Sequence, residues 1–227
     1  MDLKFDFSFK TNVSNTFRQK SLIGQYDLPI EGIEQNFKGD YKLPEKWNIG
    51  LIVGNSGTGK TSIAKNAFKI KDIVKQKWND NAIIDNFNDD LSLDEITYCL
   101  GSVGFNSIPY WLKSYNVLSN GEKSRVDLAR MLAENDFSIY DEFSSMVDRD
   151  VAKSMSNSLQ KAFRKKDKQI ILLSCHKDII DWLQPDWVYD TDNKFFFVQT
   201  NINEKNSNLE YINAIKNNGI FIKNIII

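Results

Sequence analysis

The sequence predicts an α/β fold in which a mostly parallel sheet is covered by helices on both faces. Short apolar runs, typical of buried strands, alternate with longer stretches of helical periodicity between about residues 48 and 176. This alternation is typical of parallel sheets. A cluster of strand-like segments precedes it, beginning with "KFDFSF", and predicts an antiparallel layer before the core sheet.

The expected strands are short. "KFDFSF" alternates, with Phe5, Phe7 and Phe9 on one side, as in a half-buried strand. We expect further strand-like pieces at about 17–28, followed by the turn-rich "FKGDYKLPEKW". Core strands are expected in four apolar runs, at 48–54, 82–87, 137–142 and 169–176. The segment "WVYDTDNKFFFVQT" predicts a hairpin that turns at Asp192 and Asn193.

Helical patterns separate these strands. Residues 60–77 place apolar side chains on one side, and Ser92 followed by Glu95 predicts a capped helix start. Two more helices are expected at 119–134 and 149–165. We expect residues 1–200 to form one domain with a short helical subdomain at about 88–134. The tail, 201–227, predicts a short helix at 209–217 and a last strand that pack on or extend the domain.

Composition favours a soluble cytoplasmic protein. Among the 227 residues the net charge is −1, so overall charge favours neither nucleic acid nor acidic lipid as a partner. Cys99 and Cys175 form neither a metal-binding pattern nor a disulfide framework, and we expect Cys175 to be buried. No apolar run approaches the ~18 residues of a membrane span, and the first ten residues lack the apolar core of a signal peptide.

The stretch "GNSGTGKTS" has the spacing of a phosphate-binding loop and lies between an expected strand and an expected helix. Glycines let the backbone wrap around phosphate oxygens, and the helix start adds its positive dipole end. Lys60 would reach the β- and γ-phosphates, and the Thr61 hydroxyl would hold Mg²⁺. The residues expected to bind ATP here are Gly54, Asn55, Ser56, Gly57, Thr58, Gly59, Lys60, Thr61 and Ser62.

A second motif separates this chain from other phosphate-loop proteins. "LSNGEKSRVDLARML", residues 118–132, resembles the signature motif of ABC-type ATPases, and Ser119, Gly121 and Glu122 match its core. "FSIYDE" resembles the Walker B strand of that family, and "SSMVD", ending at Asp148, resembles the loop that follows it. "LLSCH" places His176 where the family has its switch histidine. The matches run in family order from about residue 50 to 180.

The resemblance implies a P-loop NTPase of ABC type that hydrolyses Mg-ATP. Asp141 would hold Mg²⁺ through water, Glu142 would polarise the attacking water, and His176 would contact the γ-phosphate together with that water. The signature faces the nucleotide of another subunit in this family. It therefore implies a head-to-tail homodimer, or a dimer of two ATPases, that closes on two ATP molecules and opens after hydrolysis. The residues that would contact nucleotide from that side are Ser119, Gly121, Glu122 and Asp148.

Two family positions are not matched directly. The family usually places a Gln after the strand that follows the phosphate-loop helix, where Asp85 or Asn86 stands here. We expect Asp85 to reach Mg²⁺ through water. The family also stacks adenine on an early aromatic residue, for which Tyr26 and Phe17 are the candidates.

Several functions are compatible with these motifs. The segment 88–117 is short for a transporter ATPase, and the chain resembles the soluble ABC-type module of bacterial and phage proteins that is often fused to an acetyltransferase-like domain. The leading prediction is a soluble ATPase whose ATP-driven closure regulates a protein partner of unknown identity. The alternatives are the nucleotide-binding subunit of a membrane ABC transporter and an accessory ATPase of a nucleic-acid modification, repair or phage-defence system. A small-molecule kinase would leave the signature and His176 without a role.

Overall fold

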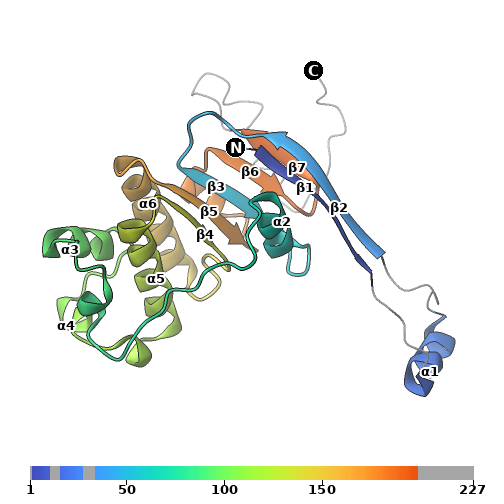
Figure 1. The fold of residues 1–227 in the computed structure, drawn as a ribbon, viewed down its shortest axis with the longest axis horizontal. Helices are drawn as coiled ribbons and strands as arrows, with labels where there is room; N and C mark the ends of the chain where they lie inside the picture. Colours follow the sequence, from blue (N-terminus) through green and yellow to red (C-terminus); the bar gives the residue numbers. More distant parts are fainter. Residues whose placement is uncertain (1, 11–15, 28–33, 199–227) are drawn as a thin grey trace.

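The computed structural model describes residues 2–10, 16–27 and 34–198, which form two sheets and the helices packed on them (Figure 1). The larger sheet has the strand order β4-β5-β3-β6-β7, in which only β7 is antiparallel to its neighbour. β1 and β2 form a separate antiparallel pair. The prediction of a mostly parallel core sheet with an N-terminal antiparallel layer is confirmed. The strands are β1 Asp2–Lys10, β2 Glu34–Lys42, β3 Ile49–Val53, β4 Phe137–Tyr140, β5 Gln169–Ser174, β6 Trp187–Asp190 and β7 Phe195–Val198.

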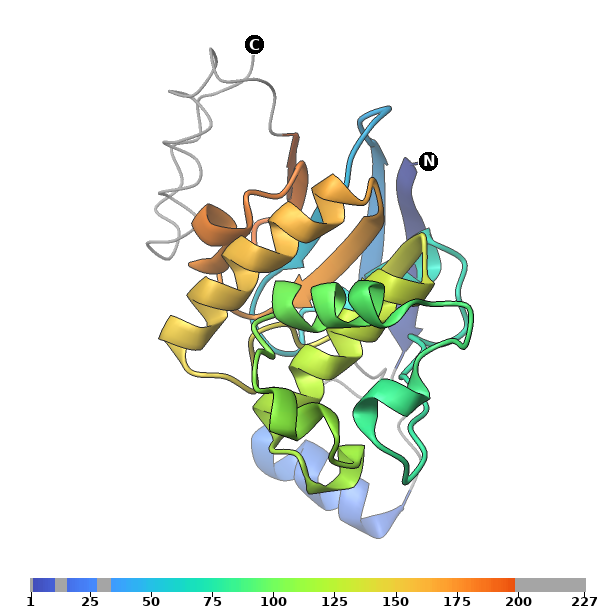
Figure 2. The same cartoon turned by 90° about the vertical axis from the view of Figure 1, so that its left-hand side faces the viewer.

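The central strand β3 is buried along its whole length, and its side chains alternate between two apolar cores. Leu51 faces the core that contains side chains of the helices α3, α5, α6 and α7, which Figure 2 shows in part as the green and gold helices in front of the sheet. Ile52 faces the second core, which β1 and α2 complete from the other side. The helices are α1 Phe17–Tyr26, α2 Lys60–Ala67, α3 Leu93–Ser102, α4 Ile108–Trp111, α5 Asn120–Glu134, α6 Arg149–Lys165 and α7 Ile179–Leu183.

The expected helix starts and the hairpin are present. Ser92 caps α3 and exchanges hydrogen bonds with Glu95, and α5 and α6 begin directly after Ser119 and Asp148. β6 and β7 form the expected antiparallel pair. Local capping chemistry fixed these boundaries, because the first amides of a helix need an acceptor that a nearby side chain can supply. The predicted tail helix and last strand lie outside the described residues.

The predicted helix at 60–77 is too long. α2 ends at Ala67 because Lys69 takes a left-handed conformation with φ 53°. The amide of Lys69 then donates to the carbonyl of Asn66, and the amide of Ile70 donates to that of Lys65. This pattern satisfies the last carbonyls and stops the helix.

The predicted core strand at 82–87 is wrong. The structure has a short 3₁₀ helix there, η1 Ile83–Asn86. The buried amide of Asn86 accepts from the backbone of Asn79 and donates to the carbonyl of Ala82, so a side chain replaces the strand ladder. Among the described strands, β4 therefore lies at the edge of the larger sheet.

The N-terminal prediction needs two corrections. Residues 17–26 form α1 rather than strands, with Thr16 accepting from the amide of Gln19. The "FKGDYK" part of the expected turn lies within β2. Gly39 stands opposite Phe5 in the β1–β2 pair, and a Cβ atom there would lie 2.5 Å from the Phe5 ring. The glycine therefore serves close packing rather than a turn. Figure 1 shows α1 beyond the far end of the β1–β2 ribbon.

A second 3₁₀ helix, η2 Tyr115–Val117, precedes the signature. Among the residues that the structure describes, no helix is long and apolar enough to cross a membrane.

Candidate active site

The loop between β3 and α2 carries the glycine-rich motif. Gly57 and Gly59 have φ angles of 82° and 87°, the left-handed region that favours glycine. A Cβ atom on Gly59 would also lie 2.6 Å from the ring of Phe37. The loop and the start of α2 line a cavity of about 370 Å³. The lining residues from this segment are Ser56, Gly57, Gly59, Lys60, Thr61 and Ser62.

Lys60 begins α2 and bends back over the loop. Its ammonium donates to the carbonyl oxygens of Gly54 at 2.8 Å and Asn55 at 2.7 Å. The positive charge thus lies beside loop amides and the positive end of α2, an arrangement suited to an anion such as a phosphate.

An acidic pair lines the same cavity as Lys60. Asp141 and Glu142 follow β4 directly, and both line the cavity. The Thr61 hydroxyl donates to Asp141 Oδ2 at 2.7 Å. Hydroxyl and carboxylate oxygens are the ligands that Mg²⁺ prefers, so this pair fits the metal. Within residues 2–10, 16–27 and 34–198 no group of three or more His, Cys, Asp or Glu side chains could hold a metal. Phosphate oxygens and water would have to complete the coordination.

The backbone after Asp141 has an unusual conformation. Glu142 and Ser144 have φ angles of 56° and 67°, which are costly for residues with a side chain. Neighbouring contacts hold this segment in place. The amide of Phe143 donates to the carbonyl of Leu173, and the Ser174 hydroxyl donates to the carbonyl of Phe143. The end of β5 therefore holds the backbone on the C-terminal side of Glu142, directly after β4.

His176 follows β5 and reaches the same segment. Its Nδ1 lies 2.9 Å from the Ser144 hydroxyl, and its amide donates to the Ser174 hydroxyl. Burial, together with the nearby Arg149, lowers the pKa of the imidazole, and Asp178 opposes this shift. The lowered pKa favours the neutral form of the ring. Its neighbour Cys175 is exposed rather than buried, contrary to expectation.

The signature residues lie at two helix starts. The Ser119 hydroxyl accepts from the amide of Glu122, whose carboxylate accepts from the amide and the hydroxyl of Ser119. Asp148 accepts from the amide of Val151 at the start of α6. Gly121 is packed tightly, because a Cβ atom there would lie 3.1 Å from Val147. None of the four predicted signature-side residues lines the cavity at the glycine-rich loop.

A second cavity, of about 590 Å³, adjoins the acidic pair. Its lining includes Asp141 and Glu142 from one side and Asn120 and Lys123 of α5 from the other. The Ser124 and Tyr140 hydroxyls are hydrogen bonded at 2.6 Å and also line this cavity. The start of the signature helix and the acidic pair therefore share one cavity in a single chain.

Other predicted residues lie elsewhere. Asp85 is exposed on η1 and lines neither cavity, and the Asn86 amide is engaged with backbone. Phe17 and Tyr26 are 85% and 63% exposed on α1, and they too line neither cavity.

Two aromatic residues that the sequence reasoning did not single out as site residues lie at the glycine-rich loop instead. Phe9 of β1 and Phe37 of β2 line its cavity. The Phe37 ring stacks on Phe7 with centroids 4.9 Å apart. The alternation of "KFDFSF" indicated Phe9, but no local signal indicated Phe37, because its segment had the composition of a turn.

Comparison with known proteins found one partial sequence match and several solved structures of similar fold. No model of a known protein family matches the sequence. One curated relative, the probable ATP-dependent transporter ycf16 of Trieres chinensis, is 34% identical over 76 residues. That match spans 33% of this chain and only 30% of the relative's length.

Solved structures match over most of the chain. The dimeric ATP-binding cassette MJ0796, in a post-hydrolysis state with ADP and Pi, has a TM-score of 0.60 at 11% identity over 89% of this chain and 100% of that one. The structure of cbiO1 from Clostridium perfringens, part of the ABC transporter complex cbiONQ, has a TM-score of 0.54 at 20% identity over 83% and 88%. The chain therefore has the fold of the ATP-binding cassettes of ABC transporters.

Proposed function

We propose that the chain binds and hydrolyses Mg-ATP as an ABC-type ATPase. The observation that carries this proposal is the contact between Thr61 and Asp141, which joins the glycine-rich loop to the end of β4 at one cavity. Glu142 lines the same cavity. A phosphate cradle, an oxygen pair suited to Mg²⁺ and a candidate base thus occur within one site.

Each residue has a role that follows from its place. The loop amides and Lys60 would bind the β- and γ-phosphates, and Thr61 and Asp141 would hold Mg²⁺. The metal neutralises phosphate charge when it is bound. Glu142 accepts a proton from the attacking water and orients it, while neutral His176 contacts the γ-phosphate. Asp85 is exposed and lines neither cavity, so its proposed water-mediated contact with the metal requires the side chain to move closer.

The adenine base is assigned to the aromatic pair of the first sheet. Phe9 and Phe37 line the cavity beside Gly59, and an aromatic face there suits a purine ring. This assignment replaces Phe17 and Tyr26, which lie on α1.

The second half of each site comes from another copy of the chain. Ser119, Gly121, Glu122 and Asp148 lie outside the loop cavity of their own chain, and the start of α5 presents a positive dipole end. The structural relatives with the fold of this chain include dimeric cassettes. Two copies arranged head to tail would place each signature on the triphosphate held by the other, and hydrolysis would release the closed state.

Closure of the dimer regulates a partner protein. The short helical segment before the signature exposes Ile108, Leu112 and Val117, each more than 60% accessible, and this surface is the place where a partner would sense the closure. A soluble partner, including a nucleic-acid-modifying or defence enzyme, remains the leading assignment. A membrane transporter subunit is the second candidate, and the names of the relatives favour it.

Size-exclusion chromatography of Glu142→Gln with and without Mg-ATP tests the proposal. The variant should bind ATP, elute as a dimer only with Mg-ATP, and lose turnover by about 10²-fold, the scale of a positioned acid–base group. Glu45→Gln, at an exposed residue, is the control and should behave as the native chain does. Unchanged turnover in Glu142→Gln would remove Glu142 from the mechanism. Co-purification with a multi-span membrane protein would favour the transporter assignment.

A further inference from the structure

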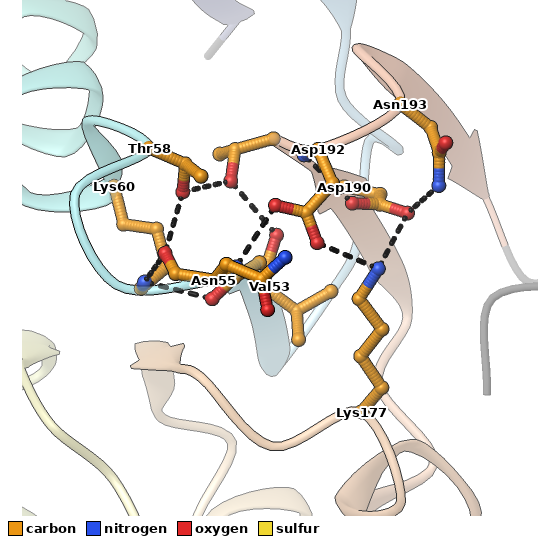
Figure 3. Close-up of polar contacts among 10 residues, drawn as sticks. Val53, Asn55, Thr58, Lys60, Lys177, Asp190, Asp192 and Asn193 are labelled. Carbon is orange, nitrogen blue, oxygen red and sulfur yellow. Dashed lines mark hydrogen bonds and ion pairs between the residues drawn. The ribbon is translucent and has the colours of Figure 1, made fainter. Parts of the chain in front are cut away.

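The turn between β6 and β7 lies directly behind the glycine-rich loop, as Figure 3 shows for Asp192 and Asn55. The amide of Asn55 donates to Asp192 Oδ1 at 2.9 Å. The hydroxyls of Thr58 and Thr191 are 2.6 Å apart, and Thr191 also donates to the carbonyl of Val53. The turn therefore holds the loop at its start and near its middle.

The packing between the two segments leaves no spare room. A Cβ atom on Gly54 would lie 2.0 Å from the Thr191 hydroxyl oxygen. The first glycine of the motif is thus required by the turn behind it, independently of any phosphate in front.

The same turn is tied to the loop that carries His176. Asp192 Oδ2 lies 2.8 Å from the ammonium of Lys177, the residue after His176. Lys177 lies 3.4 Å from Asp190, whose side chain is fully buried. Asp190 accepts in addition from Asn193 and from the amide of Asp192. Figure 3 shows Lys177 pointing to both carboxylates.

Charge makes this cluster sensitive to Lys177. Two carboxylates share one ammonium, and the lysine and Asp192 are 14% and 17% exposed. Removing the ammonium would leave two neighbouring negative charges with little water, which is strongly unfavourable. Asp192 would then turn outward and release the amide of Asn55.

We propose that Asp192 is a positioning residue for the nucleotide, with Lys177 acting through it. One carboxylate holds the glycine-rich loop through Asn55 and holds the loop of His176 through Lys177. Strand pairing brings these segments together, because β3 pairs in parallel with both β5 and β6. The inference rests on the proposed nucleotide binding and adds two residues to it that do not line the cavity at the glycine-rich loop.

Titration of the 227-residue chain with a fluorescent N-methylanthraniloyl-ATP in Mg²⁺ tests the inference. Asp192→Ala should weaken nucleotide binding by about 10-fold, the scale of one hydrogen bond to a charged acceptor. Asp192→Asn keeps an acceptor for the amide of Asn55 and should recover most of that loss. Lys177→Met should weaken binding by a similar factor. The double variant Lys177→Met with Asp192→Asn should bind better than Lys177→Met alone, because it removes one of the two carboxylate charges that the single variant leaves without the ammonium.

Asp186 provides a matched control at the opposite end of β3. Its carboxylate accepts from the amides of Asn48 and Ile49, both at 2.8 Å, and pairs with Arg164. Asp186→Ala should therefore lower the unfolding temperature but leave nucleotide affinity unchanged.

The outcomes separate the two proposals. Native affinity in Asp192→Ala would overturn the inference while leaving the nucleotide site intact. Equal loss of affinity in Asp186→Ala would also overturn it, because the effect would then be general destabilisation. Absence of binding by the native chain would overturn the proposed function and the inference together.

Discussion

Asp127 of α5 joins three segments of the helical region, and its removal should destabilise the fold measurably. Its carboxylate accepts from the Trp78 indole at 2.7 Å and from the Tyr115 hydroxyl at 3.0 Å. The two rings are stacked with centroids 4.9 Å apart and an interplanar angle of 5°. We consider Asp127→Ala, which removes the shared acceptor and leaves both donors in place.

The magnitude follows from these contacts. A hydrogen bond to a charged group contributes about 1.5 kcal/mol or more, so two such bonds give about 3 kcal/mol. Burial raises the pKa of Asp127, and the hydrogen bonds from Trp78 and Tyr115 oppose that shift, so removing the desolvated carboxylate returns part of this energy. We expect a net loss of about 2 kcal/mol in the free energy of unfolding. For a chain of this size that corresponds to a fall in Tm of about 4–8 °C.

Urea unfolding followed by tryptophan fluorescence, together with calorimetry, would measure the loss. Asp127→Asn should lose only about 1 kcal/mol, because the amide oxygen still accepts from Trp78 and the amide nitrogen can donate to Tyr115. Asp89→Ala, at an exposed acid, should stay within about 0.5 kcal/mol of the native chain. A loss below that value in Asp127→Ala would refute the reasoning, since the two bonds would then contribute nothing.

Two further predictions concern His176 and Ser119. The pKa of His176 is lowered in the folded chain, so the stability it contributes is fully present above its ordinary value of 6.5 and is lost as the pH falls through the folded value. His176→Gln should therefore flatten the dependence of Tm on pH below 6.5, and an unaltered profile by calorimetry would contradict this. Ser119→Ala and Ser92→Ala remove equivalent helix caps and should each lose about 1 kcal/mol of stability. Only Ser119→Ala should reduce ATP-dependent dimerisation in the Glu142→Gln background, and equal effects on chromatography would count against the signature role.

The core of the fold could be predicted because its signals are local. β3 and the middle of β5, residues 170–173, are apolar runs, and Ser119 and Asp148 stand where their helices need an acceptor. Such patterns depend on burial and capping, which a single stretch of sequence carries.

The errors arose where contacts that the apolar or turn pattern does not show decide the structure. Gly39 belongs to a strand because it faces Phe5 across the β1–β2 pair, although its neighbours have the composition of a turn. Residues 82–87 have an apolar run, yet the buried Asn86 amide takes the backbone partners that a strand would need. At Gly39 the pairing with a distant strand overrode the local pattern, and at Asn86 a local hydrogen bond from a side chain to the backbone did so.

The candidate site divides in the same way. The spacing of Gly54, Gly59 and Lys60 predicted the loop, because the chemistry itself requires that spacing. The position of Phe37 depends on the register of β2 against β1, and the contact of Asp192 with Asn55 depends on the pairing of β6 with β3. No local motif in the sequence predicts either strand register.

The hydrogen bonds between Ser119 and Glu122 have a consequence for the energetics of closure. Burial opposes ionisation of Glu122, but hydrogen bonds from Ser119, with the charge of Arg125, lower its pKa. The Ser119 hydroxyl therefore already donates a hydrogen bond to a carboxylate of its own helix, that of Glu122. When a triphosphate binds, the Ser119 hydroxyl would exchange its hydrogen bond to the Glu122 carboxylate for one to a phosphate oxygen. One charged acceptor would thus replace another, and no water would have to be removed from the hydroxyl for this bond. The free energy cost of dehydrating this hydroxyl when two chains associate would then be small. After hydrolysis, the Ser119 hydroxyl would again donate to the Glu122 carboxylate.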